Sequence, residues 1–273
     1  METQLNKETT PSSSTSQPWP LRRVGLRVLD LDSEVDYYTR FGLSILRDER
    51  PNGPEGGVGL GFGTQEVLSL RPLTNGRPRP RRSAGLYHFA LLLPDETALG
   101  SFIQHCIEQN IPIDGASDHL VSQALYLSDV EGNGIEVYAD RPRETWQFSG
   151  NTIVMDTLPL NAAALLKKAQ TFEGFPTDSR LGHMHLNVGN LDRSRAFYEK
   201  LGMNLMVGLA NSANFLSWEG YHHHLGINVW AGRNVPPVEP DVAGIDFYEI
   251  QRPDLEPATL TDPDGINVIV SGC

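Results

Sequence analysis

Four segments of the chain open with a strand-like alternation of apolar and polar residues. Two of them match each other closely, namely residues 23–43 (RVGLRVLDLDSEVDYYTRFGL) and residues 183–203 (HMHLNVGNLDRSRAFYEKLGM). Each predicts a strand, a turn at Asp or Asn, and an amphipathic helix that ends at Phe-Gly or Leu-Gly. The other two openers are residues 87–95 and 246–254, where an Asp again closes the strand. The sequence therefore indicates a fourfold internal repeat.

Further strands are expected after each opener, because apolar runs there are broken by Gly, Asn or Asp turn signals. These runs are residues 57–72, 124–140, 214–230 and 258–272. The repeating unit is thus a strand, a helix and three strands, and the fold class is α+β with four tandem βαβββ units. Between Asp254 and Ala258 the fourth unit has no room for a helix, so we expect it to be pruned.

The units group into two predicted domains. Residues 21–142 hold the first and second units, and residues 180–273 hold the third and fourth. Residues 143–179 form a linker with a short helix expected at 161–169. Residues 1–20 are polar and rich in Ser, Thr and Pro, which predicts a disordered tail.

Composition narrows the possible partners. The chain has 273 residues and a net charge of −12, which argues against nucleic acid or an anionic membrane as a partner. No run of apolar residues is long enough for a membrane span. The two cysteines, Cys106 and Cys273, form no metal motif, so a reducing compartment, the cytoplasm, is expected.

A motif in the second unit adds a resemblance. Its residues are His119, Leu125, Tyr126, Asp129, Gly132 and Glu136. This spacing resembles the pattern of extradiol dioxygenases, although Val130 stands where Pro is usual and Ser117 where Gly is common. With the fourfold repeat, the chain resembles the vicinal-oxygen-chelate superfamily of glyoxalase I, bleomycin-resistance proteins and type I extradiol dioxygenases. Over residues 20–273 it is most similar to the two-domain bacterial catechol-2,3-dioxygenases, whose units form cupped, open β-sheets.

The resemblance implies a divalent metal held between two units. It places a ligand seven residues before the end of an opening strand, where His88 and His183 stand in the second and third units. The first and fourth units carry Arg23 and Phe247 there, and neither can ligate a metal. His185 is a rival to His183, because residues two apart on a strand share a face.

The last strand of a unit can supply a carboxylate. In the second unit this residue is Glu136, whereas the comparable position of the fourth unit is Ile269. Two histidines and one carboxylate suit non-haem Fe(II), although Mn(II), Zn(II) or Ni(II) are also possible. Because the ligands lie in the second and third units, these two units are expected to face each other within one chain. A homo-oligomer in which His183 comes from a second chain is the alternative.

The resemblance also implies residues for catalysis. His223 aligns with an acid–base histidine on the last strand of the third unit, within a run of three histidines. Neighbours on a strand face opposite sides, so His222 and His224 would share one face and His223 the other. His119 and Tyr126 would hydrogen-bond the substrate oxygens.

Together these features predict an extradiol ring-cleaving dioxygenase that acts on a small aromatic diol with O2, in aromatic hydrocarbon catabolism. One alternative is another metal enzyme of the superfamily, an isomerase or lyase of the glyoxalase type. Such enzymes commonly use a fourth ligand, which would lie near Leu225, where no carboxylate stands. The other alternative is a metal-free protein that binds a small molecule.

Overall fold

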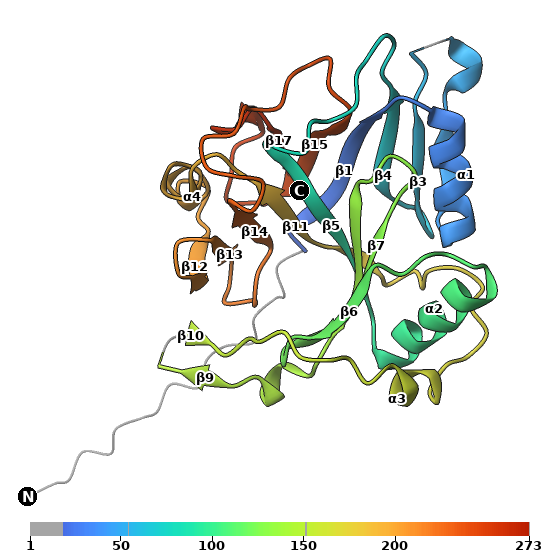
Figure 1. The fold of residues 1–273 in the computed structure, drawn as a ribbon, viewed down its shortest axis with the longest axis vertical. Coiled ribbons are helices and arrows are strands. Elements are labelled where there is room, and N and C mark those ends of the chain that lie inside the picture. Colours follow the sequence, from blue (N-terminus) through green and yellow to red (C-terminus); the bar gives the residue numbers. More distant parts are fainter. Residues whose placement is uncertain (1–18, 54, 151, 273) are drawn as a thin grey trace, which may run out of the picture.

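A computed structural model describes residues 19–53, 55–150 and 152–272. Within this part the chain forms two large mixed sheets, a two-stranded sheet and four α-helices (Figure 1). The helices are α1 (Leu31–Phe41), α2 (Glu96–Glu108), α3 (Ala162–Leu166) and α4 (Leu191–Glu199). Two 3-10 turns are η1 (Arg50–Asn52) and η2 (Arg143–Thr145). None of the described helices is long and apolar enough to cross a membrane.

The first sheet combines the first and fourth repeat units. Its seven strands lie in the order β16-β17-β15-β1-β4-β3-β2. Their bounds are β1 (Leu21–Val28), β2 (Ser44–Asp48), β3 (Val58–Phe62), β4 (Gln65–Pro72), β15 (Gly244–Gln251), β16 (Ala258–Thr261) and β17 (Asn267–Ser271). The two units meet where β1 runs antiparallel to β15.

The second sheet combines the second and third units. Its eight strands lie in the order β12-β13-β14-β11-β5-β8-β7-β6. Their bounds are β5 (Gly85–Leu93), β6 (Gly115–Asp118), β7 (Ser122–Ser128), β8 (Gly134–Asp140), β11 (Arg180–Asn187), β12 (Asn204–Leu209), β13 (Ala213–Ser217) and β14 (Leu225–Asn228). Antiparallel β5 and β11 join the units near the centre of Figure 1. The expected pairing of the second unit with the third, within one chain, is confirmed, as is the α+β fold of repeated units.

The residues that close the opening strands start the helices. The side chains of Asp30, Asp95 and Asn190 each accept a hydrogen bond from a backbone N–H three residues on, as the N-caps of α1, α2 and α4. This capping explains why an Asp or Asn recurs at the same place in the repeat. In the fourth unit no helix lies between β15 and β16 of the described chain, as expected.

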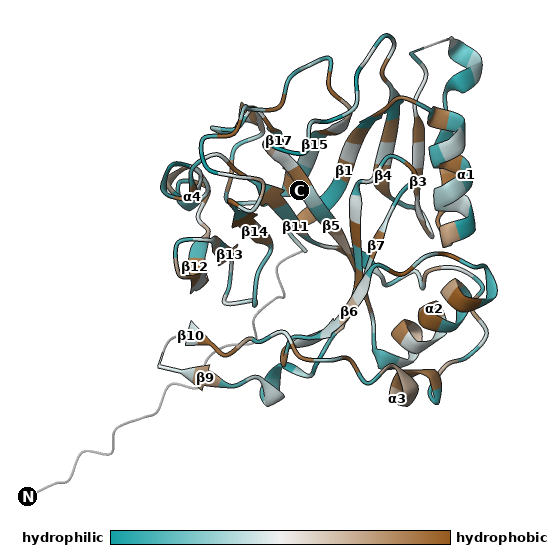
Figure 2. Cartoon of the chain, in the orientation of Figure 1, coloured by the Kyte–Doolittle hydropathy of each residue, from teal (hydrophilic) through white to brown (hydrophobic). Residues whose placement is uncertain are grey.

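One face of each helix is buried against a sheet. In α1, Val35, Tyr38 and Phe41 recur every three residues on the side that is buried, and the helix packs beside β4. Figure 2 shows brown, hydrophobic segments along the strands and on parts of α1 and α2, with loops mostly teal or pale. One large apolar cluster runs through both sheets, so the two sheets share a core.

The segment between residues 143 and 179 has more structure than the single helix expected for it. It contains η2, the two-stranded sheet of β9 (Phe148–Ser149) and β10 (Thr152–Ile153), and α3. The helix expected at 161–169 is α3, shorter than predicted, with Asn161 as its N-cap. Of the predicted tail, residues 1–18 lie outside the described residues, whereas Trp19 packs against the second sheet and donates a hydrogen bond to the carbonyl of Leu181.

Candidate metal centre

His88, Glu136 and His183 lie on three adjacent strands of the second sheet, β5, β8 and β11. The strand register brings them together around Ala90: Glu136 on β8 and His183 on β11 both pair with this residue. Paired residues on neighbouring strands share a face, and His88 shares it too, because it stands two residues from Ala90 on β5. The small side chain of Ala90, fully buried, leaves space above it in which the three longer side chains converge.

Three ligand-type atoms meet at this point. Nε2 of His88 lies 3.0 Å and Nε2 of His183 lies 3.1 Å from the same carboxylate oxygen, Oε2 of Glu136. The two imidazole nitrogens are 3.3 Å apart. Ligands bound about 2.1 Å from a shared ion and about 90° apart would be separated by about 3 Å, so the triangle has the spacing of a metal-binding set. All three side chains are buried.

The electrostatics favour the protonation states that a metal needs. Burial alone would raise the pKa of Glu136, but His183 and His88 beside it hold this pKa well below its usual range. Burial lowers the pKa of His183 to about 4, although Glu136 opposes the shift. A charged carboxylate and a neutral imidazole are the metal-binding forms of these residues.

His185, the rival of His183, faces the same side of β11 but does not belong to this set of three. It pairs with His88 across the strands, and its ring lies against Tyr87 and Trp230 at 5.0 and 5.2 Å between centroids. The residue opposite it on β14 is Gly226, in the place that Glu136 takes in the second unit. A Cβ at Gly226 would lie 2.8 Å from the His185 ring. The expected vacancy near Leu225 is thus a glycine that makes room for His185.

A cavity of about 510 Å³ opens beside the three residues. Both His88 and Glu136 line it, as do the predicted catalytic residues His119, Tyr126 and His223. Its remaining wall is mainly apolar or aromatic: Tyr87, Met155, Val207, Leu209, Phe215 and Trp230. Of the described residues that line it, none is Lys or Arg. The sequence did not reveal this wall, because its members come from β5, β12, β13, the loop after β14 and the segment before α3.

His119 and Tyr126 form a hydrogen-bonded pair in the cavity. Nδ1 of His119 lies 2.7 Å from the backbone carbonyl of Asp156, and Nε2 lies 2.6 Å from the hydroxyl of Tyr126. Because a carbonyl only accepts, Nδ1 carries the proton, and Nε2 accepts from the tyrosine. Burial raises the pKa of Tyr126 far above its usual value, with Glu136 adding to the shift, so the tyrosine keeps the proton that it donates. Its oxygen is left able to accept from a bound molecule.

The three consecutive histidines lie before β14 rather than on a strand, so the expected alternation of faces is wrong. Their side chains take three directions. His223 faces the cavity, with its ring 4.1 Å from that of His183. His222 lies behind it, fully buried, and His224 lies 2.9 Å from the hydroxyl of Ser217. Of the three, the residue expected at the site is the one that lines the cavity.

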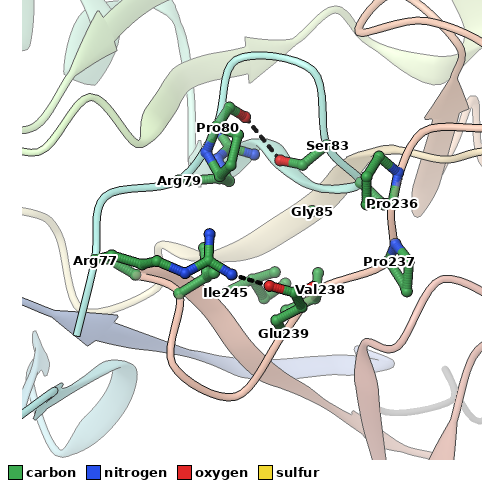
Figure 3. A pocket seen from close by; sticks show the side chains of 13 residues that line it. Arg77, Arg79, Pro80, Ser83, Gly85, Pro236, Pro237, Val238, Glu239 and Ile245 are labelled. Carbon is green, nitrogen blue, oxygen red and sulfur yellow. Dashed lines mark hydrogen bonds and ion pairs between the residues drawn. The ribbon is translucent and has the colours of Figure 1, made fainter. Parts of the chain in front are cut away.

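A second, smaller cavity of about 210 Å³ lies apart from these residues (Figure 3). It is bounded by the segments 77–85 and 236–245. Its two arginines already have partners, since Arg77 pairs with Glu239 and Asp241, and Arg79 donates to the carbonyl of Leu86. Among the described residues that line it there is no histidine or cysteine, so it offers no set of metal-ligand type.

Comparisons with known proteins identify the family to which the chain belongs. The family model described as the Glyoxalase/Bleomycin resistance protein/Dioxygenase superfamily matches residues 21–137. The catechol-2,3-dioxygenase of Bacillus subtilis (strain 168) is 48% identical over 205 residues, which are 72% of this chain and 71% of that protein. The chain belongs to this superfamily. The likeness also confirms the prediction of an enzyme of the dioxygenase type.

Solved structures show the same fold at low identity. A proposed dioxygenase from Bacillus subtilis subsp. subtilis str. 168 aligns with a TM-score of 0.59 and 12% identity. The alignment covers 92% of the present chain and 84% of the Bacillus chain. Glyoxalase I from Zea mays aligns with a TM-score of 0.56 and 19% identity, covering 92% and 91%. Both likenesses establish the vicinal-oxygen-chelate fold and nothing finer.

Proposed function

We propose that the chain is a non-haem, Fe(II)-dependent extradiol dioxygenase that cleaves the ring of a catechol-type aromatic diol with O2. The observation that carries this proposal is the triangle of His88, Glu136 and His183 beside a largely apolar cavity. Two neutral imidazoles and one carboxylate are a ligand set that suits Fe(II) and leaves coordination positions open. Mn(II) has similar ligand preferences and is the nearest alternative metal.

The surroundings of the triangle fit such an ion. Glu136 supplies one negative charge in a buried place, where its pKa is held low by the two histidines. The position from which a fourth protein ligand would come is Gly226, so nothing on β14 closes the site. His88, Glu136 and His183 would hold Fe(II), which would supply Lewis-acid activation of the diol and electron transfer to O2.

The chain's own residues would bind and orient the ring. The oxygen of Tyr126, which donates its proton to His119, can accept a hydrogen bond from a substrate hydroxyl. The aromatic and aliphatic wall would exclude water and stack the ring, and the absence of cations from the lining favours a substrate without a carboxylate. His223 would take the proton of the second hydroxyl at its free ring nitrogen.

A glyoxalase-type isomerase is disfavoured by Gly226, since that chemistry commonly uses a fourth, carboxylate ligand. The decisive experiment is metal analysis of anaerobically purified protein, with a panel of catechols assayed with and without O2. We expect bound iron and a coloured, ring-opened product that requires O2. Zinc at full occupancy with activity on a thiohemiacetal would refute the proposal.

We further propose the cytoplasm as the place of action and aromatic hydrocarbon catabolism as the pathway. Cys106 is a buried, free thiol, which suits a reducing compartment. The three proposed ligands come from one chain, so a homo-oligomer is not needed to complete the site. The acidic charge of −12 supports a small-molecule partner over nucleic acid or an anionic membrane.

A further inference from the structure

A chain of buried and partly buried hydrogen bonds leads away from the cavity behind His223. Nδ1 of His223 lies 2.8 Å from Nδ1 of His222, and Nε2 of His222 lies 2.9 Å from Oδ1 of Asp140, the last residue of β8. The other carboxylate oxygen of Asp140 lies 2.9 Å from the hydroxyl of Tyr221, which in turn lies 2.8 Å from the hydroxyl of Tyr138. Two hydrogen-bonded branches therefore end on one carboxylate.

The proton on each contact can be assigned from what each group is able to do. The carboxylate of Asp140 accepts only, so Nε2 of His222 donates to it. A neutral imidazole carries one proton, which leaves Nδ1 of His222 as an acceptor. The contact between the two histidines then requires that Nδ1 of His223 donates. The remaining nitrogen of His223, Nε2, carries a lone pair and no proton.

No other contact fixes the ring of His223 in this way. The bond to His222 is the one hydrogen bond that its side chain makes within the described part of the chain. The rings of His183 and Phe215 lie against it, at 4.1 and 5.0 Å between centroids, but packing against a ring face does not select a tautomer. The orientation and the tautomer of His223 therefore depend on His222, and through it on Asp140.

We propose that Asp140 and His222 are positioning residues, which hold His223 in the tautomer whose unprotonated Nε2 can act as the base. This inference rests on the proposed function, because it assigns a partner to the proposed base. Neither residue touches the substrate: His222 is fully buried, and neither residue lines the cavity. Residues that orient a functional histidine in this way typically change activity by about 10- to 100-fold when they are replaced.

The test compares three variants at His222 and His224 with the wild-type holoenzyme. His222→Phe keeps an aromatic ring but removes the acceptor, so we expect kcat to fall by about 10- to 100-fold with KM and metal content little changed. His222→Asn returns an acceptor oxygen close to the place of Nδ1 and should restore part of kcat. The matched control is His224→Phe, which alters a buried, hydrogen-bonded histidine of the same run outside the cavity and should leave kcat unchanged.

The tautomer is read independently of activity, by ¹⁵N NMR of histidine-labelled protein loaded with diamagnetic Zn(II). We expect an unprotonated Nε2 and a protonated Nδ1 for His223 in the wild type, and a mixture of tautomers in His222→Phe. An unchanged tautomer and an unchanged kcat in His222→Phe would overturn the inference. His223→Ala separates the two proposals: if it lowers kcat but His222→Phe does not, only the positioning role fails. If His223→Ala itself leaves kcat unchanged, the proposed base is wrong and the positioning role falls with it.

Discussion

The two large sheets have the same construction but very different contents where their units meet. In the second sheet, the strands β5, β8 and β11 bring His88, Glu136 and His183 together. In the first sheet, the corresponding positions on β1, β4 and β15 carry Arg23, Ser69 and Phe247, as the matching register shows. We call the place where two units meet within a sheet its seam. The seam of the second sheet has a set of metal-ligand type, whereas these three positions in the seam of the first sheet carry none of those ligands.

A guanidinium occupies the seam of the first sheet. Nε of Arg23 donates to Glu249 at 2.7 Å, and a second nitrogen donates to Glu66 at 3.2 Å. The residue that corresponds to Ala90 is Gly25, where a Cβ would lie 2.2 Å from the Phe247 ring. Ion pairs and a stacked ring thus fill the space in which the other seam gathers three ligands. The comparison teaches that the fold provides two equivalent places, and that a few side chains decide which one gathers a set of metal-ligand type.

The largest effect should come from removing the carboxylate of the second sheet. We expect Glu136→Ala to reduce the iron content to background and to abolish ring cleavage, because the two remaining imidazoles lack the anionic ligand. Elemental analysis after anaerobic reconstitution measures this. The control is Glu249→Ala in the first sheet, which should keep both iron and activity. Iron content that stayed at the wild-type level in Glu136→Ala would show that the ligand assignment is wrong.

The next prediction separates the two histidines of β11. His183→Ala should lose most of the bound iron, since its Nε2 is one corner of the ligand triangle. His185→Ala should retain the iron, because His185 stands outside the triangle and packs on Tyr87 and Trp230. Parallel metal analysis of the two variants decides between them. The reverse result would show that His185, and not His183, is the ligand on β11.

A smaller effect is expected on stability, which should depend on pH more strongly in the second sheet than in the first. Burial lowers the pKa of His183 to about 4, and burial also lowers the pKa of His185, His223 and His224 well below the usual value of 6.5. A histidine held neutral in the folded protein binds fewer protons than it does when unfolded. Protonation of the unfolded chain therefore costs no stability above pH 6.5. As the pH falls from 6.5 toward the folded pKa, the free energy of unfolding decreases by at most about 1.4 kcal/mol per pH unit for each such histidine.

All eight histidines of the chain lie between residues 88 and 224, in the second and third units. We therefore expect the metal-free protein to lose stability between pH 6.5 and 4 mainly in the second sheet. Hydrogen exchange at pH 7.5 and 5.5, corrected for the intrinsic exchange rate at each pH, measures this, and we expect protection to fall more in β5, β8 and β11 than in β1 and β4 at the lower pH. An equal loss of protection in both sheets would contradict the prediction.

The smallest effect is expected in the first sheet. Arg23 is about one-third exposed, with a side-chain exposure of 35%, so its ion pairs are partly screened by solvent. Arg23→Met should change the free energy of unfolding by less than about 1 kcal/mol and leave the iron content unchanged. Urea unfolding of the two proteins gives the difference. A loss of metal in this variant would mean that the two seams are coupled.

Local sequence signals predicted the repeat and its helices well. Asp30, Asp95 and Asn190 mark the helix starts, because an N-cap is a local interaction between neighbours in sequence. The pairing of the second unit with the third followed from where the candidate ligands stood. What remained open was the register, since His183 and His185 share a face and only the strand pairing of β11 tells them apart.

Other features of the site depend on contacts between distant segments and left no local signal. The carbonyl of Asp156, which sets the tautomer of His119, belongs to a segment that the sequence predicted only as a linker. The run of His222 to His224 was expected on a strand, but it lies before β14, so alternation could not describe it. Backbone carbonyls and loop directions are fixed by packing rather than by residue type, and they become visible only in three dimensions.

The site depends on the antiparallel contact between β5 and β11, two strands that are far apart in the sequence. It therefore cannot form until late in the synthesis of the chain. His88 and Glu136 leave the ribosome well before His183, which stands 95 residues after His88. The ligand triangle is therefore incomplete until the third unit has emerged and paired with the second. A metal bound there would join the early and late parts of the chain, so metal uptake would report that β11 has reached its place beside β5.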